Sequence, residues 1–128
     1  MPPKVLVVED NDMNMQLVEY LLEEGGFAIL KAASGEEALD LTSRETPDLI
    51  LMDIHLPGMD GLSVVRALKK SDRTANTPVL ALTAHAMRGD RDRFLAAGCD
   101  GYISKPIDVK TFVTSIRRYL PGSGDSPA

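Results

Sequence analysis

The chain has 128 residues, of which 44% are hydrophobic and 26% are charged, as in an ordinary globular protein. We expect a single folded domain over residues 1–120, because a domain commonly takes roughly 100 to 200 residues. The formal net charge of −5 disfavours nucleic acid as a direct partner, since binding to a phosphate backbone requires a basic surface.

Five short apolar segments predict the strands of a sheet. In chain order they are residues 4–9, 28–32, 49–53, 79–83 and 101–104. The second of them gives the weakest signal, and each of the other four is closed by a polar residue. Fully apolar strands of this length are typical of a sheet that is buried on both faces.

The segments between the strands predict helices, because their apolar residues recur three and four positions apart. Two such sets are Leu17, Val18, Leu21 and Leu22 in the first segment, and Phe112, Val113, Ile116 and Leu120 in the last. Ser34, with Glu37 three residues later, predicts a capping box at the start of the second helix. Gly25 and Gly26 are expected to end the first helix, and Asp108 is expected to cap the last.

Strand and helix alternate five times, which predicts a parallel sheet with right-handed crossover helices on both faces. The expected fold is an α/β three-layer (βα)5 sandwich of the flavodoxin-like type, with a parallel five-stranded sheet in the order 2-1-3-4-5. Residues 121–128, PGSGDSPA, are too polar to pack and are expected to form a disordered tail.

Polar residues gather at the carboxyl ends of the predicted strands. They are Glu9 and Asp10 at the first strand, Asp53 at the third, Thr83 at the fourth and Lys105 after the fifth. In open parallel sheets ligands bind outside these ends, at the point where the strand order reverses, which here lies between strands 1 and 3. We therefore expect the three carboxylates to meet at that point.

Three acidic groups held together repel, so either their pKa values rise or a cation keeps them ionised. A divalent cation is the simpler explanation, and oxygen ligands alone favour Mg²⁺, which commonly shares its remaining positions with phosphate. Thr83 and Lys105 offer donors for a phosphoryl oxygen. A carboxylate beside Mg²⁺ and these donors can act as a nucleophile towards phosphorus and form an aspartyl phosphate.

Four motifs follow one another along the chain. They are VLVVEDN at residues 5–11, DLILMDIHLPGMDG at 48–61, LTAHAM at 82–87 and YISKPI at 102–107. Together they resemble the receiver domain of two-component response regulators, over about residues 4–120. The resemblance is greatest to receivers of hybrid histidine kinases and to single-domain receivers of the DivK type.

The resemblance implies roles for the acidic residues. Asp53 would be the phosphoacceptor, and Asp10 a direct ligand of the metal. Glu9 would support the metal through a bound water, and His55 would contribute its backbone carbonyl. The pair Glu9 and Asp10 departs from the chemotaxis-type pattern of two aspartates, which leaves the division of metal-holding roles open.

The resemblance also implies a switch. Thr83 and Lys105 would bind phosphoryl oxygens, and Tyr102 would be the aromatic residue whose inward turn accompanies the movement of Thr83. Before phosphorylation we expect the Lys105 ammonium to pair with Asp53. The Lys105-Pro106 peptide bond is expected to be cis, because a bend is needed to turn the lysine back into the site.

The function implied is a signalling module and not an enzyme with a separate substrate. It would take a phosphoryl group from a histidine kinase or a histidine phosphotransfer protein, and it would catalyse only its own phosphorylation and slow dephosphorylation. A downstream protein would bind the face formed by the fourth helix, the fifth strand and the fifth helix. Neither nucleic acid binding nor membrane insertion is expected.

The alternative is a Mg²⁺-dependent phosphohydrolase of the haloacid dehalogenase type, which also uses an aspartate nucleophile, threonine and lysine on an α/β sheet. That class resembles a DxD pattern, with an acid/base aspartate two residues after the nucleophile. In this chain His55 occupies the corresponding position, and the chain is short for a cap domain.

The cysteine content and the lack of long apolar segments suggest the cellular compartment in which the protein works. The single cysteine, Cys99, cannot form a disulfide within the chain, and we interpret it as a structural thiol. No segment approaches the roughly 18 apolar residues of a membrane span. The expected location is the cytoplasm.

Overall fold

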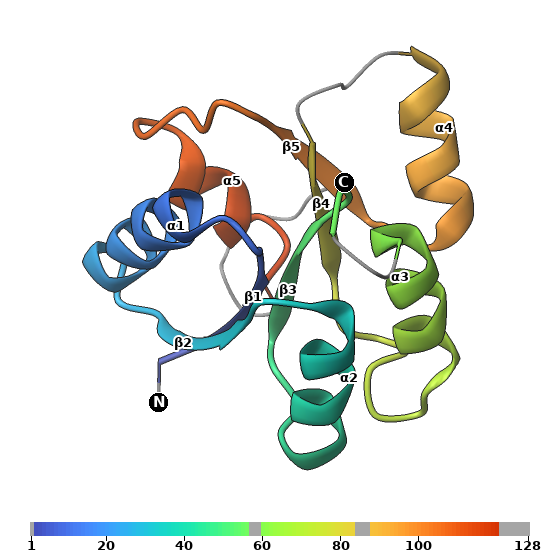
Figure 1. Ribbon diagram of the computed structural model, residues 1–128. Coiled ribbons are helices and arrows are strands. Elements are labelled where there is room, and N and C mark those ends of the chain that lie inside the picture. Colours follow the sequence, from blue (N-terminus) through green and yellow to red (C-terminus); the bar gives the residue numbers. More distant parts are fainter. Residues whose placement is uncertain (1, 57–59, 84–87, 121–128) are drawn as a thin grey trace.

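Five parallel strands form the centre of the molecule in this computed structural model, which describes residues 2–56, 60–83 and 88–120 (Figure 1). The strands are β1 (Lys4–Val8), β2 (Ala28–Ala32), β3 (Leu49–Asp53), β4 (Val79–Thr83) and β5 (Gly101–Ser104). Their order in the sheet is β2-β1-β3-β4-β5, as expected from the sequence. The expected tail at residues 121–128 lies outside the described residues.

Helices cover both faces of the sheet. They are α1 (Asp12–Glu24), α2 (Gly35–Arg44), α3 (Gly61–Lys70), α4 (Arg88–Ala97) and α5 (Phe112–Arg117). Figure 1 shows α1 and α5 on one face, and α2, α3 and α4 on the other. Two separate clusters of buried side chains fill the two spaces between sheet and helices.

The central strands are apolar along their whole length because both of their faces are covered. All five residues of β3 and of β4 are buried, whereas the edge strands β2 and β5 are only partly buried. Successive residues point to opposite faces of a sheet, so Leu6 and Val8 join one cluster and Val5 and Val7 the other. This packing holds the carboxyl ends of β1 and β3 rigidly side by side.

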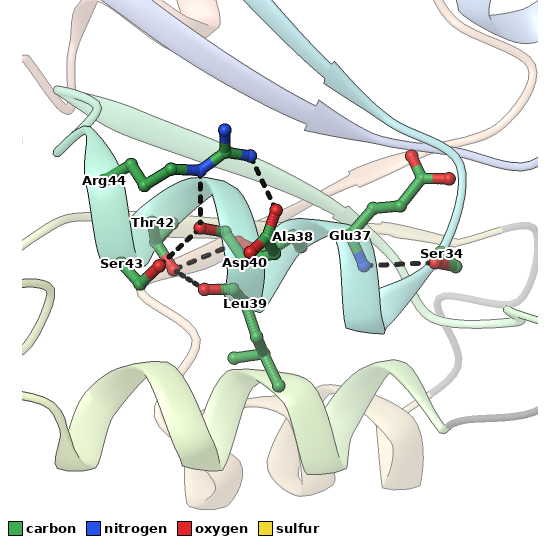
Figure 2. A network of polar contacts seen from close by, with 8 residues as sticks. All are labelled: Ser34, Glu37, Ala38, Leu39, Asp40, Thr42, Ser43 and Arg44. Atoms are coloured by element: carbon green, nitrogen blue, oxygen red, sulfur yellow. Dashed lines mark hydrogen bonds and ion pairs between the residues drawn. The ribbon is translucent and has the colours of Figure 1, made fainter.

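Side-chain caps define the starts of the first two helices. Asn11 Oδ1 accepts a hydrogen bond from Asn14 N at 2.9 Å at the start of α1. At α2, Ser34 Oγ accepts from Glu37 N at 3.2 Å, as the capping box predicted (Figure 2), and Glu37 Oε2 accepts from Ala33 N at 3.0 Å. These contacts satisfy backbone donors that have no partner inside the helix.

The body and end of α2 carry further local contacts, which Figure 2 shows together. The Thr42 hydroxyl is buried and donates to the carbonyl oxygens of Ala38 and Leu39. Arg44 pairs with Asp40 one turn earlier, with Nη2 2.6 Å from Oδ2. Contacts within α2 therefore satisfy the buried hydroxyl of Thr42 as well as the exposed charges of Asp40 and Arg44.

Two expected boundaries and one expected buried position were wrong. The strand β1 ends at Val8, so that Glu9 is the first residue beyond it. Asp108 does not cap α5, because its Oδ1 accepts from Lys110 N in a turn that precedes the helix, and α5 begins only at Phe112. Leu17, expected on the buried face of α1, is exposed, since Val18, Leu21 and Leu22 already fill that face.

Candidate functional site

Three carboxylates meet where β1 and β3 end. These strands are neighbours, with Val8 opposite Met52, so the residues that follow emerge side by side. One carboxylate oxygen from each of Glu9, Asp10 and Asp53 lies within 4.8 Å of the others. The cluster lies at the reversal of strand order that the sequence indicated.

Glu9 is the buried member of the cluster. Its Oε1 accepts a hydrogen bond from Asn11 N at 3.3 Å, and its Oε2 accepts from Lys105 Nζ at 3.0 Å. Burial raises the pKa of Glu9, the hydrogen bond from Lys105 opposes that rise, and the charge of Asp53 adds to it. The Lys105 ammonium therefore offsets part of the rise in the Glu9 pKa that burial causes.

Asp53 ends the central strand β3 and is also buried. Its Oδ1 accepts a hydrogen bond from the backbone N–H of His55 at 3.0 Å, and its Oδ2 lies 3.6 Å from Lys105 Nζ. The expected pairing of Lys105 with Asp53 is thus present, but its nitrogen lies closer to Glu9. The His55 N–H fixes the orientation of the Asp53 carboxylate.

Asp10 is exposed, which leaves the cluster open to solvent on one side. Two buried carboxylates and one exposed carboxylate give an oxygen-only donor set that can be entered from water. Mg²⁺ favours such hard oxygen ligands and keeps several of its own waters. The residues therefore fit a hard divalent cation.

Two further residues are positioned by β4 and β5. Thr83 ends β4 and is buried, next to β3 in the sheet. Lys105 follows β5, and its backbone N–H donates to the carbonyl oxygen of Thr83 at 2.8 Å. The Lys105-Pro106 bond is cis, as expected. The lysine main chain is thus anchored at the end of the sheet, and its side chain reaches across to the acidic cluster.

Tyr102 lies on the edge strand β5, with 38% of its surface exposed. It pairs in register with Ala81, two residues before Thr83 on the neighbouring strand. Residues 57–59 and 84–87, which belong to two of the recognised motifs, lie outside the described residues.

Sequence reasoning missed two residues that shape the site. Asn11 donates its backbone N–H to Glu9 while its side chain caps α1, and only the second role has a sequence signal. Gly61, the first residue of α3, lies against the backbone of Asp53 and Ile54. A glycine in a sequence is usually a sign of turn chemistry, so this contact becomes visible only in the folded structure.

A membrane-spanning segment was not expected. Across the described part of the chain, none of the helices combines the length and the apolar character that crossing a bilayer requires.

Comparison with known proteins gives a consistent result. The model of the response regulator receiver domain matches residues 5–117. The polar-differentiation response regulator DivK of Brucella anthropi is 48% identical over 120 residues, which cover 94% of this chain and 98% of that protein. DivK of Brucella ovis has the same identity and coverage.

Solved structures agree with this match. The chemotaxis response regulator CheY4 of Vibrio cholerae superimposes with a TM-score of 0.89 at 30% identity, over 94% of this chain and 100% of that one. The receiver domain of a sensor histidine kinase from Pseudomonas aeruginosa has a TM-score of 0.86 at 34% identity, over 93% of this chain and 98% of that one. That structure holds a magnesium ion coordinated in its active site cleft.

Proposed function

The chain belongs to the response regulator receiver domain family, and on that basis we propose that Asp53 accepts a phosphoryl group from a phosphohistidine at a Mg²⁺ site formed with Glu9 and Asp10. Its relatives and its fold make it a DivK-like response regulator of a two-component system.

One observation carries the assignment of Asp53. It is the carboxylate at the end of the central strand, with Glu9 and Asp10 oxygens within 4.8 Å and the Lys105 ammonium 3.6 Å away. In the transfer, an Asp53 oxygen forms a bond to phosphorus while the bond from phosphorus to the histidine nitrogen breaks, and the imidazole keeps that electron pair. The product is an acyl phosphate on Asp53.

The residues around Asp53 would stabilise the negative charge of the transferred phosphoryl group. Bound Mg²⁺ would neutralise phosphoryl oxygens, with Asp10 as a direct ligand, Glu9 acting through water, and Asp53 and the His55 carbonyl completing the protein's share. Lys105 would donate to one phosphoryl oxygen, and the Thr83 hydroxyl to another. Reversal by water would release phosphate slowly, so the module would catalyse its own phosphorylation and dephosphorylation only.

Signal output would follow from the movement of Thr83. A hydrogen bond from its hydroxyl to the phosphoryl group would draw Thr83 inward, and Tyr102 would turn into the space left behind. Tyr102 stands on the edge strand, so its turn would alter the surface made by α4, β5 and α5, where a downstream protein would bind. The donor would be a histidine kinase or a histidine phosphotransfer protein, and the setting would be the cytoplasm.

The haloacid dehalogenase alternative is not supported. The receiver model matches residues 5–117, and the second aspartate that such a phosphohydrolase needs is replaced by His55. The acidic cluster joins residues at the carboxyl ends of β1 and β3, as the positions of the polar residues in the sequence predicted.

Phosphorylation by a small donor tests the proposal. Incubation with acetyl phosphate and Mg²⁺ should add one phosphoryl group, seen by intact mass, and the adduct should be lost on treatment with hydroxylamine. Asp53→Asn should gain none, whereas Asp40→Asn, an exposed aspartate on α2, should be modified like the wild type. An adduct on Asp53→Asn, or one that survives hydroxylamine, would contradict the assignment.

A further inference from the structure

Lys105 is shared unequally between two carboxylates. Its Nζ lies 3.0 Å from Glu9 Oε2, within hydrogen-bond distance, and 3.6 Å from Asp53 Oδ2, where only an ion pair remains. The lysine that would serve the phosphoryl group therefore has Glu9, and not the phosphoacceptor, as its principal partner in this structure.

Both oxygens of Glu9 are engaged. The Glu9 side chain has no exposed surface, Oε2 accepts from Lys105, and Oε1 accepts from Asn11 N. The Lys105 side chain is 19% exposed, so the pair is largely withdrawn from water. Separating such a pair without a replacement for the positive charge is costly, because it leaves a charge buried and uncompensated.

Only the side chain of Lys105 is free to move away. Its backbone N–H is held by the Thr83 carbonyl at 2.8 Å, whereas the long flexible stem lets the ammonium swing between neighbouring oxygens. A divalent cation near Glu9 and Asp10 would supply the charge that Lys105 now provides. The ammonium could then leave Glu9 at little cost.

We propose that the Glu9–Lys105 ion pair is a latch that keeps the ammonium closer to Glu9 than to Asp53 until a divalent cation takes its place beside Glu9. Glu9 is then a positioning residue for Lys105 as well as a support for the metal. Because the two cations compete for one carboxylate, metal binding and the availability of Lys105 to a phosphoryl group are coupled. This inference rests on the proposed Mg²⁺ site.

A metal-free measurement tests the latch itself. In ¹⁵N-labelled protein, the Lys105 ammonium should give an NMR signal with slowly exchanging protons in the wild type and in Asp53→Asn. This signal should be absent in Glu9→Gln. Lys69 is the matched internal control, since its side chain is 20% exposed and donates to Thr77 O at 2.8 Å and Asp100 Oδ2 at 3.1 Å. A Lys105 signal that depends on Asp53 and survives Glu9→Gln would overturn the latch.

Mg²⁺ affinity tests the competition. Calorimetric titration of Mg²⁺ into the wild type, Lys105→Met, Glu9→Gln and the double variant gives a double-mutant cycle. Removing Lys105 should tighten Mg²⁺ binding by at least roughly tenfold when Glu9 is present, as expected for loss of a hydrogen bond between charged groups. In the Glu9→Gln background the same change should tighten binding by less than about twofold.

The possible failures are distinguishable. Equal tightening in both backgrounds would overturn the latch while leaving the Mg²⁺ site intact. A wild type that binds no Mg²⁺, although its Lys105 signal depends on Glu9, would overturn the proposed metal function and the competition with it. Glu9→Asp keeps the charge but shortens the side chain, and it should weaken the Lys105 signal without abolishing the fold, as judged by an unchanged Lys69 signal.

Discussion

Gly61 lies directly against the backbone of Asp53. A Cβ atom built at Gly61 would meet the Asp53 carbonyl oxygen and would lie 2.8 Å from the Cα of Ile54. The Gly61 N–H also donates to the carbonyl oxygen of Ile54 at 3.3 Å. The start of α3 is therefore packed onto the backbone that presents the Asp53 carboxylate, and no side chain fits between them.

Gly61→Ala should lower the free energy of unfolding by about 1 to 3 kcal/mol, as overpacking does, and it should slow phosphorylation because Asp53 must shift. Gly26→Ala is the control, because Gly26 has φ +85° and open space around it. Alanine there should lower the free energy of unfolding by about 1 kcal/mol, and only because it strains the backbone at positive φ. Urea unfolding and acetyl phosphate labelling measure both effects. A Gly61→Ala protein as stable as the wild type would show that the contact relaxes freely.

Asp10→Ala should weaken Mg²⁺ binding more than Glu9→Ala does, because Asp10 is expected to coordinate the ion directly and Glu9 through water. Asp12→Ala removes a neighbouring exposed carboxylate in the first turn of α1 that lies outside the cluster, and it should bind Mg²⁺ nearly as the wild type does. Calorimetric titration with Mg²⁺ measures the affinity of each of these three variants. Equal affinity in Asp10→Ala and the wild type would exclude Asp10 as a ligand.

Thr83→Ala should still be phosphorylated but should fail to switch, because the methyl group cannot donate to the phosphoryl oxygen that draws the residue inward. With beryllofluoride as a phosphoryl mimic, amide chemical shifts at Tyr102 should change in the wild type and stay unchanged in Thr83→Ala. Thr114→Ala, an exposed threonine on α5, should respond like the wild type. Shift changes confined to the Asp53 surroundings in the wild type would refute the switch.

The buried thiol of Cys99 should make the free energy of unfolding fall as the pH becomes alkaline. Burial raises the pKa of its thiol to about 11 from 9.0, with a smaller contribution from Asp100. A group whose pKa is raised on folding stabilises fully below its unfolded pKa, so the contribution of Cys99 should be lost as pH rises from 9.0 towards 11. The difference in unfolding free energy between the wild type and Cys99→Ala should shrink over that range, as measured by urea titration. A constant difference would contradict burial of the thiol.

Most of the fold could be predicted from the sequence, because its strands are short apolar runs and its site residues follow them directly. All five strands were expected within one residue of their observed bounds, and their order was expected correctly. The meeting of Glu9, Asp10 and Asp53 followed from the same reasoning, since the carboxyl ends of neighbouring parallel strands share one edge of the sheet.

The remaining features could not be predicted because they depend on how far side chains extend and how closely helices and strands approach each other in the folded structure. The preference of Lys105 for Glu9 over Asp53 depends on side-chain length across two strands. The role of Gly61 depends on how closely α3 approaches β3. The start of α5 was misplaced because Asp108 is a good cap in either a turn or a helix.

The two partners in the Glu9 hydrogen bond to Lys105 are 96 residues apart in the sequence. A ribosome makes the amino-terminal end first, so a growing chain exposes its acidic residues well before residue 105 emerges. Until β5 adds to β4, Glu9 and Asp53 lack the Lys105 ammonium that lies beside them in the folded protein. The acidic cluster therefore gains its positive neighbour only after the chain has been synthesised past β5 and has folded.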